Sequence, residues 1–127
     1  MQEQHLYEYA IIRVVPRVER EEFINVGVVI CHWKRNFLRS KIHLDSKKLL
    51  MLDPLADVEM IQLNLASSEK ICTGATNGGN IATMDLASRF RWLTAVRSSI
   101  IQTSRPHSGY AEDLEKTLER LFEENVE

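Results

Sequence analysis

The segment from Phe23 to Trp33 constrains the fold more than any other part of the chain. It reads Phe-Ile-Asn-Val-Gly-Val-Val-Ile-Cys-His-Trp, and its centre is almost continuously apolar and β-branched. A strand with one face in water alternates apolar and polar residues, whereas a continuous apolar run belongs to a strand that is covered on both faces. We therefore predict a strand here that is covered on both faces. Gly27 within it indicates a bulge or a close approach by another backbone segment.

Three further strands are predicted around this one. Residues 7–15 are aromatic and β-branched and stop at Pro16. Residues 37–44 alternate in polarity, and residues 98–103 carry a pair of isoleucines before a break at 106–109. The first three strands follow one another through short connections, which predicts a meander of antiparallel hairpins.

The helical signals lie between and after these strands. Asp45 can cap a short turn that runs to Leu50. Asp53 followed by Pro54 is a stronger start signal, for a helix that fades within residues 66–72. The remaining features are a polar, glycine-dense loop over 73–80, a helix that starts near Thr83, and a helix over about 111–125.

The resulting element order is β-β-β-α-α-β-α. Hairpin strands followed by helices predict an α+β fold, with an antiparallel sheet of about four strands and helices packed on it. The 127 residues suffice for one hydrophobic core and contain no repeat, low-complexity tract or linker, so we expect a single domain over 1–127.

Composition narrows the environment in which the chain works. No run of eighteen apolar residues and no signal peptide is present, so we expect a cytoplasmic protein without a membrane span. Cys31 and Cys72 are then expected to be small buried hydrophobes and not a disulfide. The net charge of −2 divides into +3 over residues 1–110 and −5 over residues 111–127. The acidic end is either a solvated helix face or a cover for a basic surface.

No motif identifies a cofactor or a metal. The glycines at 74, 78 and 79 have the wrong spacing for a phosphate-binding loop. The cysteines and histidines lack the second pair of ligands that a zinc site needs, and there is no nucleophile elbow. We expect no cofactor and no metal.

The connection between the first two strands is dense in polar groups. Asn25 interrupts an apolar strand, and a polar side chain at that depth needs a partner. Arg20 with Glu22, or with Glu19, can form a guanidinium–carboxylate pair that holds the hairpin in register. We favour this structural role for the polar cluster of Glu22 and Asn25 over a ligand site.

Arginines suggest a second polar surface. They gather near Trp92 and several serines, and arginine offers paired donors to phosphate or carboxylate. If the first and fourth strands are neighbours, the arginines of both regions approach one another. The candidate anion-binding residues are Arg13, Arg17, Arg20, Arg89, Arg91, Arg97 and His107. The alternative is that they pair separately with the glutamates of the first hairpin and of the acidic C-terminal helix.

Two stretches carry a resemblance to a known family. Residues 7–16 and 20–28, with the sequences Tyr-Glu-Tyr-Ala-Ile-Ile-Arg-Val-Val-Pro and Arg-Glu-Glu-Phe-Ile-Asn-Val-Gly-Val, resemble the opening of the bacterial family catalogued as domain of unknown function 3037. Residues 89–109 resemble its second signature, and residues 118–122 its end. The family carries no assigned reaction. The resemblance implies a small bacterial protein that works beside a HipA-like kinase in a toxin–antitoxin or defence-like unit.

Three hypotheses of function follow. The favoured one is a non-enzymatic binding or regulatory module that acts with a protein partner, and it predicts an exposed apolar patch or sheet edge. The second is an anion or nucleic-acid binder that uses the arginines, against which the mildly acidic chain counts. The third is an enzyme on a phosphorylated or carboxylated small molecule, with Glu22 or His107 as acid or base. The missing catalytic signature favours a protein that is not an enzyme. A homodimer through a strand edge is a further expectation.

Overall fold

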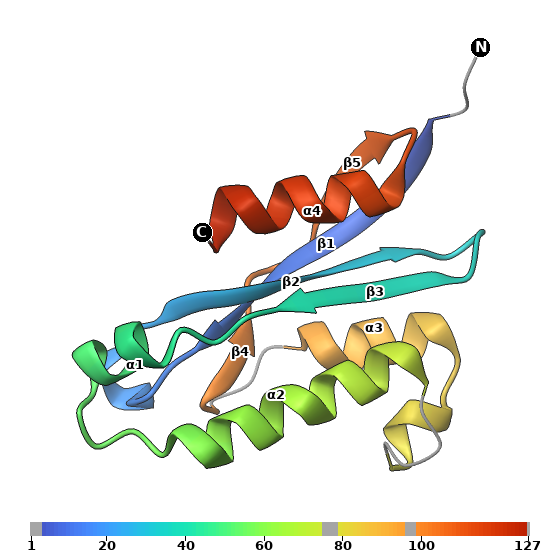
Figure 1. Cartoon of the computed structure of the whole chain (residues 1–127). Helices are drawn as coiled ribbons and strands as arrows, with labels where there is room; N and C mark the ends of the chain where they lie inside the picture. Colours follow the sequence, from blue (N-terminus) through green and yellow to red (C-terminus); the bar gives the residue numbers. More distant parts are fainter. Residues whose placement is uncertain (1–3, 75–78, 96–98, 127) are drawn as a thin grey trace.

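An open antiparallel sheet with helices on both faces forms the centre of the molecule (Figure 1). The computed structural model describes residues 4–74, 79–95 and 99–126. In these ranges the strands are β1 (His5–Val14), β2 (Ile24–His32), β3 (Phe37–Ile42), β4 (Ile101–Thr103) and β5 (His107–Ala111). The α+β class with an antiparallel sheet, predicted from the sequence, is confirmed.

Every α-helix of the described chain begins after an aspartate. The helices are α1 (Ser46–Leu52), α2 (Val58–Thr73), α3 (Leu86–Thr94) and α4 (Leu114–Asn125), with 3-10 turns η1 (Val18–Arg20) and η2 (Ile81–Thr83). The capping side chains are Asp45, Asp57, Asp85 and Asp113, each of which accepts a hydrogen bond from a backbone N–H of the first turn. Such caps satisfy amide groups that have no partner within the helix.

The predicted start of the second helix at Asp53 and Pro54 is wrong. Asp53 ends α1, and its carboxylate accepts a hydrogen bond from Leu55 N at 3.0 Å, which makes a tight turn instead of a helix. The helix begins one turn of chain later, after Asp57, and continues to Thr73 without fading. An aspartate does cap the start of α2, as predicted. However, Asp53 and Asp57 are both suitable caps, and helical residues directly follow only Asp57.

One edge of the sheet is a single row made of two strands. The strand order is β3-β2-β1-β4, and β5 pairs with β1 beside β4. Ile12 pairs with Thr103 and Tyr9 with His107, so three residues of this row face two residues of β1. At that bulge the Ser104 hydroxyl accepts a hydrogen bond from Ile11 N at 2.8 Å. The break predicted over 106–109 is therefore wrong, because the bulge lets pairing resume immediately after Pro106.

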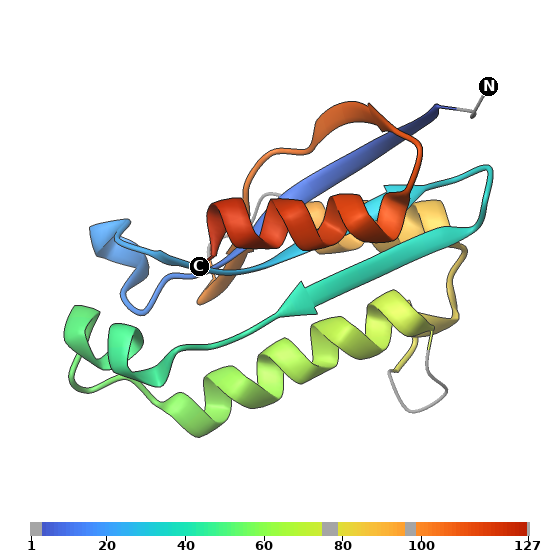
Figure 2. The same cartoon turned by 45° about the horizontal axis from the view of Figure 1, so that its top comes forward.

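Strand β2 is buried on both faces, as its apolar run predicted. Val26, Val29 and Cys31 belong to the core beneath α2 and α3, whereas Val28 and Ile30 belong to the core beneath α4. Figure 2 shows α4 on one side of the strands and α2 on the other.

Both predictions for Gly27 are confirmed. The pairing of β1 with β2 shifts register after Ile12, which faces Gly27, so that Arg13 faces Asn25. A Cβ atom at Gly27 would lie 2.6 Å from the backbone oxygen of Lys41 in β3. The unpaired residue of the bulge is Val26, next to Gly27, and the missing Cβ of Gly27 allows β3 to approach closely.

Candidate functional site

A pocket of about 360 Å³ opens between α2, α3 and β4, and we call it the central pocket. Its apolar and sulfur-bearing lining consists of Ile12, Val29, Met60, Ile71, Cys72, Trp92, Leu93, Ile100 and Ile101. Its polar lining consists of Asn64, Ser67, Ser68, Ser99, Gln102 and Thr103. Pockets of this size, mostly apolar with a few polar groups, are typical of ligand and anchor sites.

Small side chains on α2 leave the space for this pocket. Asn64, Ser67, Ser68 and Ile71 follow one another at helical spacing, so they form one stripe that faces β4. The Ser67 and Ser68 hydroxyls donate to helix carbonyls four residues earlier, at 3.2 Å and 3.3 Å. The hydroxyls of both serines are thus hydrogen-bonded within α2. Their side chains are small, and large apolar residues at these positions would fill the pocket.

Local hydrogen bonds fix the strand side of the mouth. The Ser99 hydroxyl donates to the backbone oxygen of Ile101 at 2.6 Å, and the Gln102 side-chain amide donates to the oxygen of Ser99 at 2.8 Å. These contacts hold the polar groups of the mouth in place before anything binds, which lowers the entropy that binding must overcome.

The thiol at the pocket wall is protonated at neutral pH. Burial raises the pKa of Cys72 to about 11, although a hydrogen bond from Ser40 and the charge of Arg89 oppose this rise. Burial also raises the pKa of Cys31, which lies on β2 in the same core cluster as Cys72, to about 12. Because the thiolate is the nucleophilic form, Cys72 acts here as apolar lining.

The arginines predicted as an anion site are engaged at several separate places. Arg17 pairs with the buried Asp53 at 3.7 Å, where it ties the first hairpin to α1. Arg20 pairs with Glu22 at 3.7 Å, as one of the two alternatives predicted, and both side chains are about half exposed. An exposed pair of this kind adds little stability.

Arg13 and Arg89 lie on opposite faces of the sheet. Arg13 stands above the Phe23 ring, 4.3 Å from its centroid, next to Asn25 on the face of α4. Arg89 donates to the carbonyls of Ile71 and Cys72 at 2.8 Å and 2.9 Å, where it caps the end of α2 on the other face. Arg89 therefore gives the Cys72 carbonyl a donor, and it adds a second donor to the Ile71 carbonyl, which also accepts from Gly74 N at 3.3 Å.

The other candidates also lie apart. Arg91 is exposed on α3 and reaches the Ser88 hydroxyl at 3.5 Å. His107 is exposed on β5, and its ring lies 5.5 Å from that of Tyr9. Arg97 falls outside the described residues. The structure thus brings Arg20 to Glu22 but gathers no shared hollow from the described candidates, and anion binding by these residues stays a prediction.

Asn25 has a partner for its side-chain nitrogen, whereas its Oδ1 is buried without a hydrogen bond in the described part of the chain. Its amide nitrogen donates to the backbone oxygen of Asn125 at 3.0 Å, which ties β2 to the last turn of α4. The two residues considered as an acid or base for the enzyme hypothesis, Glu22 and His107, do not line the central pocket.

The central pocket was not predicted from the sequence. Its members come from five elements that are distant along the chain, and each contributes residues that look like ordinary core or ordinary helix surface. The available signal was the run of Asn64, Ser67 and Ser68 between Met60 and Ile71 on one helix face, where small polar residues stand in place of large apolar ones. Within the described ranges, no three His, Cys, Asp or Glu side chains are grouped as a metal site, and no helix could cross a bilayer.

Comparison with known proteins places the chain in a family. The model of the family described as "Protein of unknown function (DUF3037)" matches residues 9–126, nearly the whole chain. No curated protein and no solved structure gives a significant match. The match begins within β1 and continues through α4, so it includes most of the first signature and all of the second. The chain therefore belongs to this family of proteins of unknown function.

Proposed function

We propose that the protein is a non-enzymatic binding module with a regulatory role, which takes an apolar side chain of a protein partner into the central pocket. The observation that carries this proposal is the pocket itself: about 360 Å³ of space with an apolar floor, open to the surface beside a strand at the sheet edge. Interfaces obtain most of their binding energy from a few apolar or aromatic anchors that fill such pockets.

The surroundings of the pocket support a protein partner. On α2, Met60 is 40% exposed at the pocket and Leu63 is 70% exposed nearby on the same helix. Apolar groups beside an anchor pocket enlarge the area that a macromolecular partner would remove from water. The polar rim of Asn64 and Gln102 offers hydrogen bonds to the backbone of an incoming segment.

The family resemblance suggests the class of partner to test first. The resemblance to this family implies members encoded beside a HipA-like kinase, so we propose such a kinase as the partner. Binding of the kinase through the central pocket would make this chain a regulatory subunit with no chemical step of its own.

A pocket-filling variant tests this function. Ser68→Phe adds an aromatic ring in the pocket, on a side chain that is half-buried at its wall. Glu69→Phe adds the same ring to the same helix at an exposed position outside the pocket and is the matched control. We expect Ser68→Phe to weaken kinase binding at least tenfold in calorimetric titration, and Glu69→Phe to leave it within about twofold. Equal affinities for the two variants would refute the role of the pocket.

A further inference from the structure

We infer that the outer edge of β5 is a self-association surface, through which two copies of this chain pair antiparallel into one continuous sheet. The β5 edge lies outside the central pocket, so self-association through it is independent of the proposed function. The backbone of β5 pairs with β1 on one side and with no described strand on the other.

The alternation of the ladder determines which groups of β5 point outward. Along β1, odd-numbered residues face this edge, as shown by hydrogen bonds from Val15 N to Ile100 O and from Ser104 N to Ile11 O. In β5, Gly109 faces Tyr7, so Ser108 and Tyr110 turn their N–H and C=O groups away from β1. Both residues are exposed.

The two edges of the sheet differ in their protection against pairing. Strand β3, at the opposite edge, carries Arg39 and Lys41, and Lys41 pairs with Glu119 of α4. Charged residues, especially lysine, are the usual means by which an edge strand avoids another chain. Strand β5 reads His-Ser-Gly-Tyr-Ala and carries no lysine, arginine or acidic residue. The β5 edge therefore lacks the charged side chains that protect β3.

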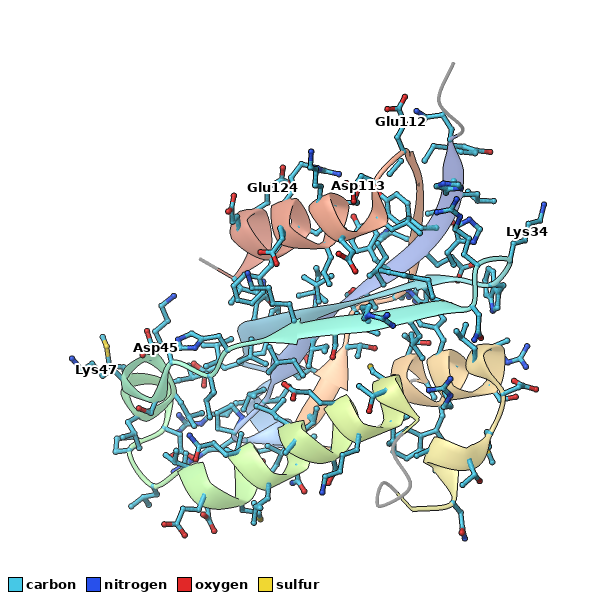
Figure 3. The ribbon with its side chains drawn as sticks, turned by 45° about the vertical axis from the view of Figure 1, so that its right-hand side comes forward. Lys34, Asp45, Lys47, Glu112, Asp113 and Glu124 are labelled. Carbon is cyan, nitrogen blue, oxygen red and sulfur yellow. The ribbon has the colours of Figure 1, made fainter. Side chains whose placement is uncertain are left out.

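Apolar side chains lie beside this edge. Tyr110 is 69% exposed, and its neighbour across the ladder, Leu6, is 49% exposed. With Trp33, which is 43% exposed, they line one hollow of about 330 Å³ at the end of the sheet. In Figure 3, Lys34, which also lines this hollow, and Glu112 mark that end of the molecule, away from Asp45 and Lys47.

The charges that flank β5 suit a second copy in the antiparallel sense. Arg105 precedes the strand and Glu112 and Asp113 follow it, and the side chains of all three are exposed. If Ser108 of each copy pairs with Tyr110 of the other, Arg105 of one copy lies opposite Asp113 of the second. Such an arrangement is self-complementary, as a two-fold interface requires.

Sedimentation velocity on the full chain tests the inference, with two variants matched in exposure. Tyr110→Lys puts a charge on the β5 edge, whereas Leu63→Lys puts one on α2 at a position that is 70% exposed. At about 100 µM we expect a mass twice 14.7 kDa for the wild type and for Leu63→Lys. For Tyr110→Lys we expect a monomer, with the dissociation constant raised at least tenfold and a thermal midpoint equal to that of the wild type at a dilution where the wild type is also monomeric.

Amide exchange of the wild type on dilution provides a measurement that needs no variant. We expect protection at Ser108 and Tyr110 to fall as the protein is diluted and the dimer dissociates. A wild type that stays monomeric, or a dimer in which neither Tyr110→Lys nor dilution changes this edge, would overturn the inference.

Discussion

Replacement of Gly27 by alanine tests how closely the central strands approach. The added Cβ would lie 2.6 Å from Lys41 O and 2.9 Å from Ile42 Cγ1, and the backbone oxygen cannot rotate away. Alanine gains roughly 0.5–1 kcal/mol from a less flexible unfolded chain, but overpacking costs about 1–3 kcal/mol, and contact with a backbone atom lies at the upper end. We expect a net loss of about 2 kcal/mol, or about 8 °C in the thermal midpoint for a chain of this length.

Calorimetric melting temperatures of Gly27→Ala and Gly79→Ala separate the cost of a steric contact from the cost of backbone strain. Gly79 has φ +83°, and an alanine methyl group there would meet no atom within 4 Å, so the substitution costs only the left-handed conformation, about 1 kcal/mol. We expect Gly27→Ala to melt at the lower temperature of the two. If Gly27→Ala melted at or above the temperature of the wild type, the close approach of β2 and β3 and the argument built on it would be refuted.

Three further changes probe contacts described above. Arg89→Met should lower the free energy of unfolding in urea by about 1–2 kcal/mol, because the Cys72 carbonyl loses its side-chain donor and the Ile71 carbonyl keeps only the one from Gly74 N; unchanged stability would mean that this cap is dispensable. Asn25→Ala should speed amide exchange in the last turn of α4, since Asn125 loses its contact with β2; an unchanged rate would count against this tie. Stability should be fully present below about pH 9 and fall as the pH rises toward 11, because the unfolded Cys72 thiol ionises before the folded one; a flat urea midpoint over this range would contradict the burial of the thiol.

The sequence predicts the sheet better than it predicts the boundaries and the pocket. The strand over β2 could be identified because a continuous apolar run of this length is typical of a strand covered on both faces, and Gly27 because glycine inside such a strand needs a reason. Strand β5 was not predicted because a proline such as Pro106 normally ends strand pairing. Only the bulge at Ser104 shows why the pairing with β1 resumes after it. That bulge depends on a hydrogen bond across the sheet, which no local pattern reveals.

In the candidate site, too, contacts between sequence neighbours could be predicted, whereas contacts between distant elements could not. The pair of Arg20 with Glu22 could be predicted because the two residues are neighbours in sequence. The role of Arg89 could not, because its acceptors lie at the end of another helix, 17 and 18 residues earlier. The central pocket arises from what small side chains leave empty, and an empty volume has no sequence motif of its own.

Methyl NMR during titration with the HipA-like kinase tests the central claim most directly. Met60, Ile12 and Ile101 place side chains at the central pocket from α2, β1 and β4. The account predicts that their methyl signals shift first and most as the kinase is added, while those of Met51, exposed at α1, stay in place. Binding that shifts other methyl groups and leaves these three unchanged would contradict it.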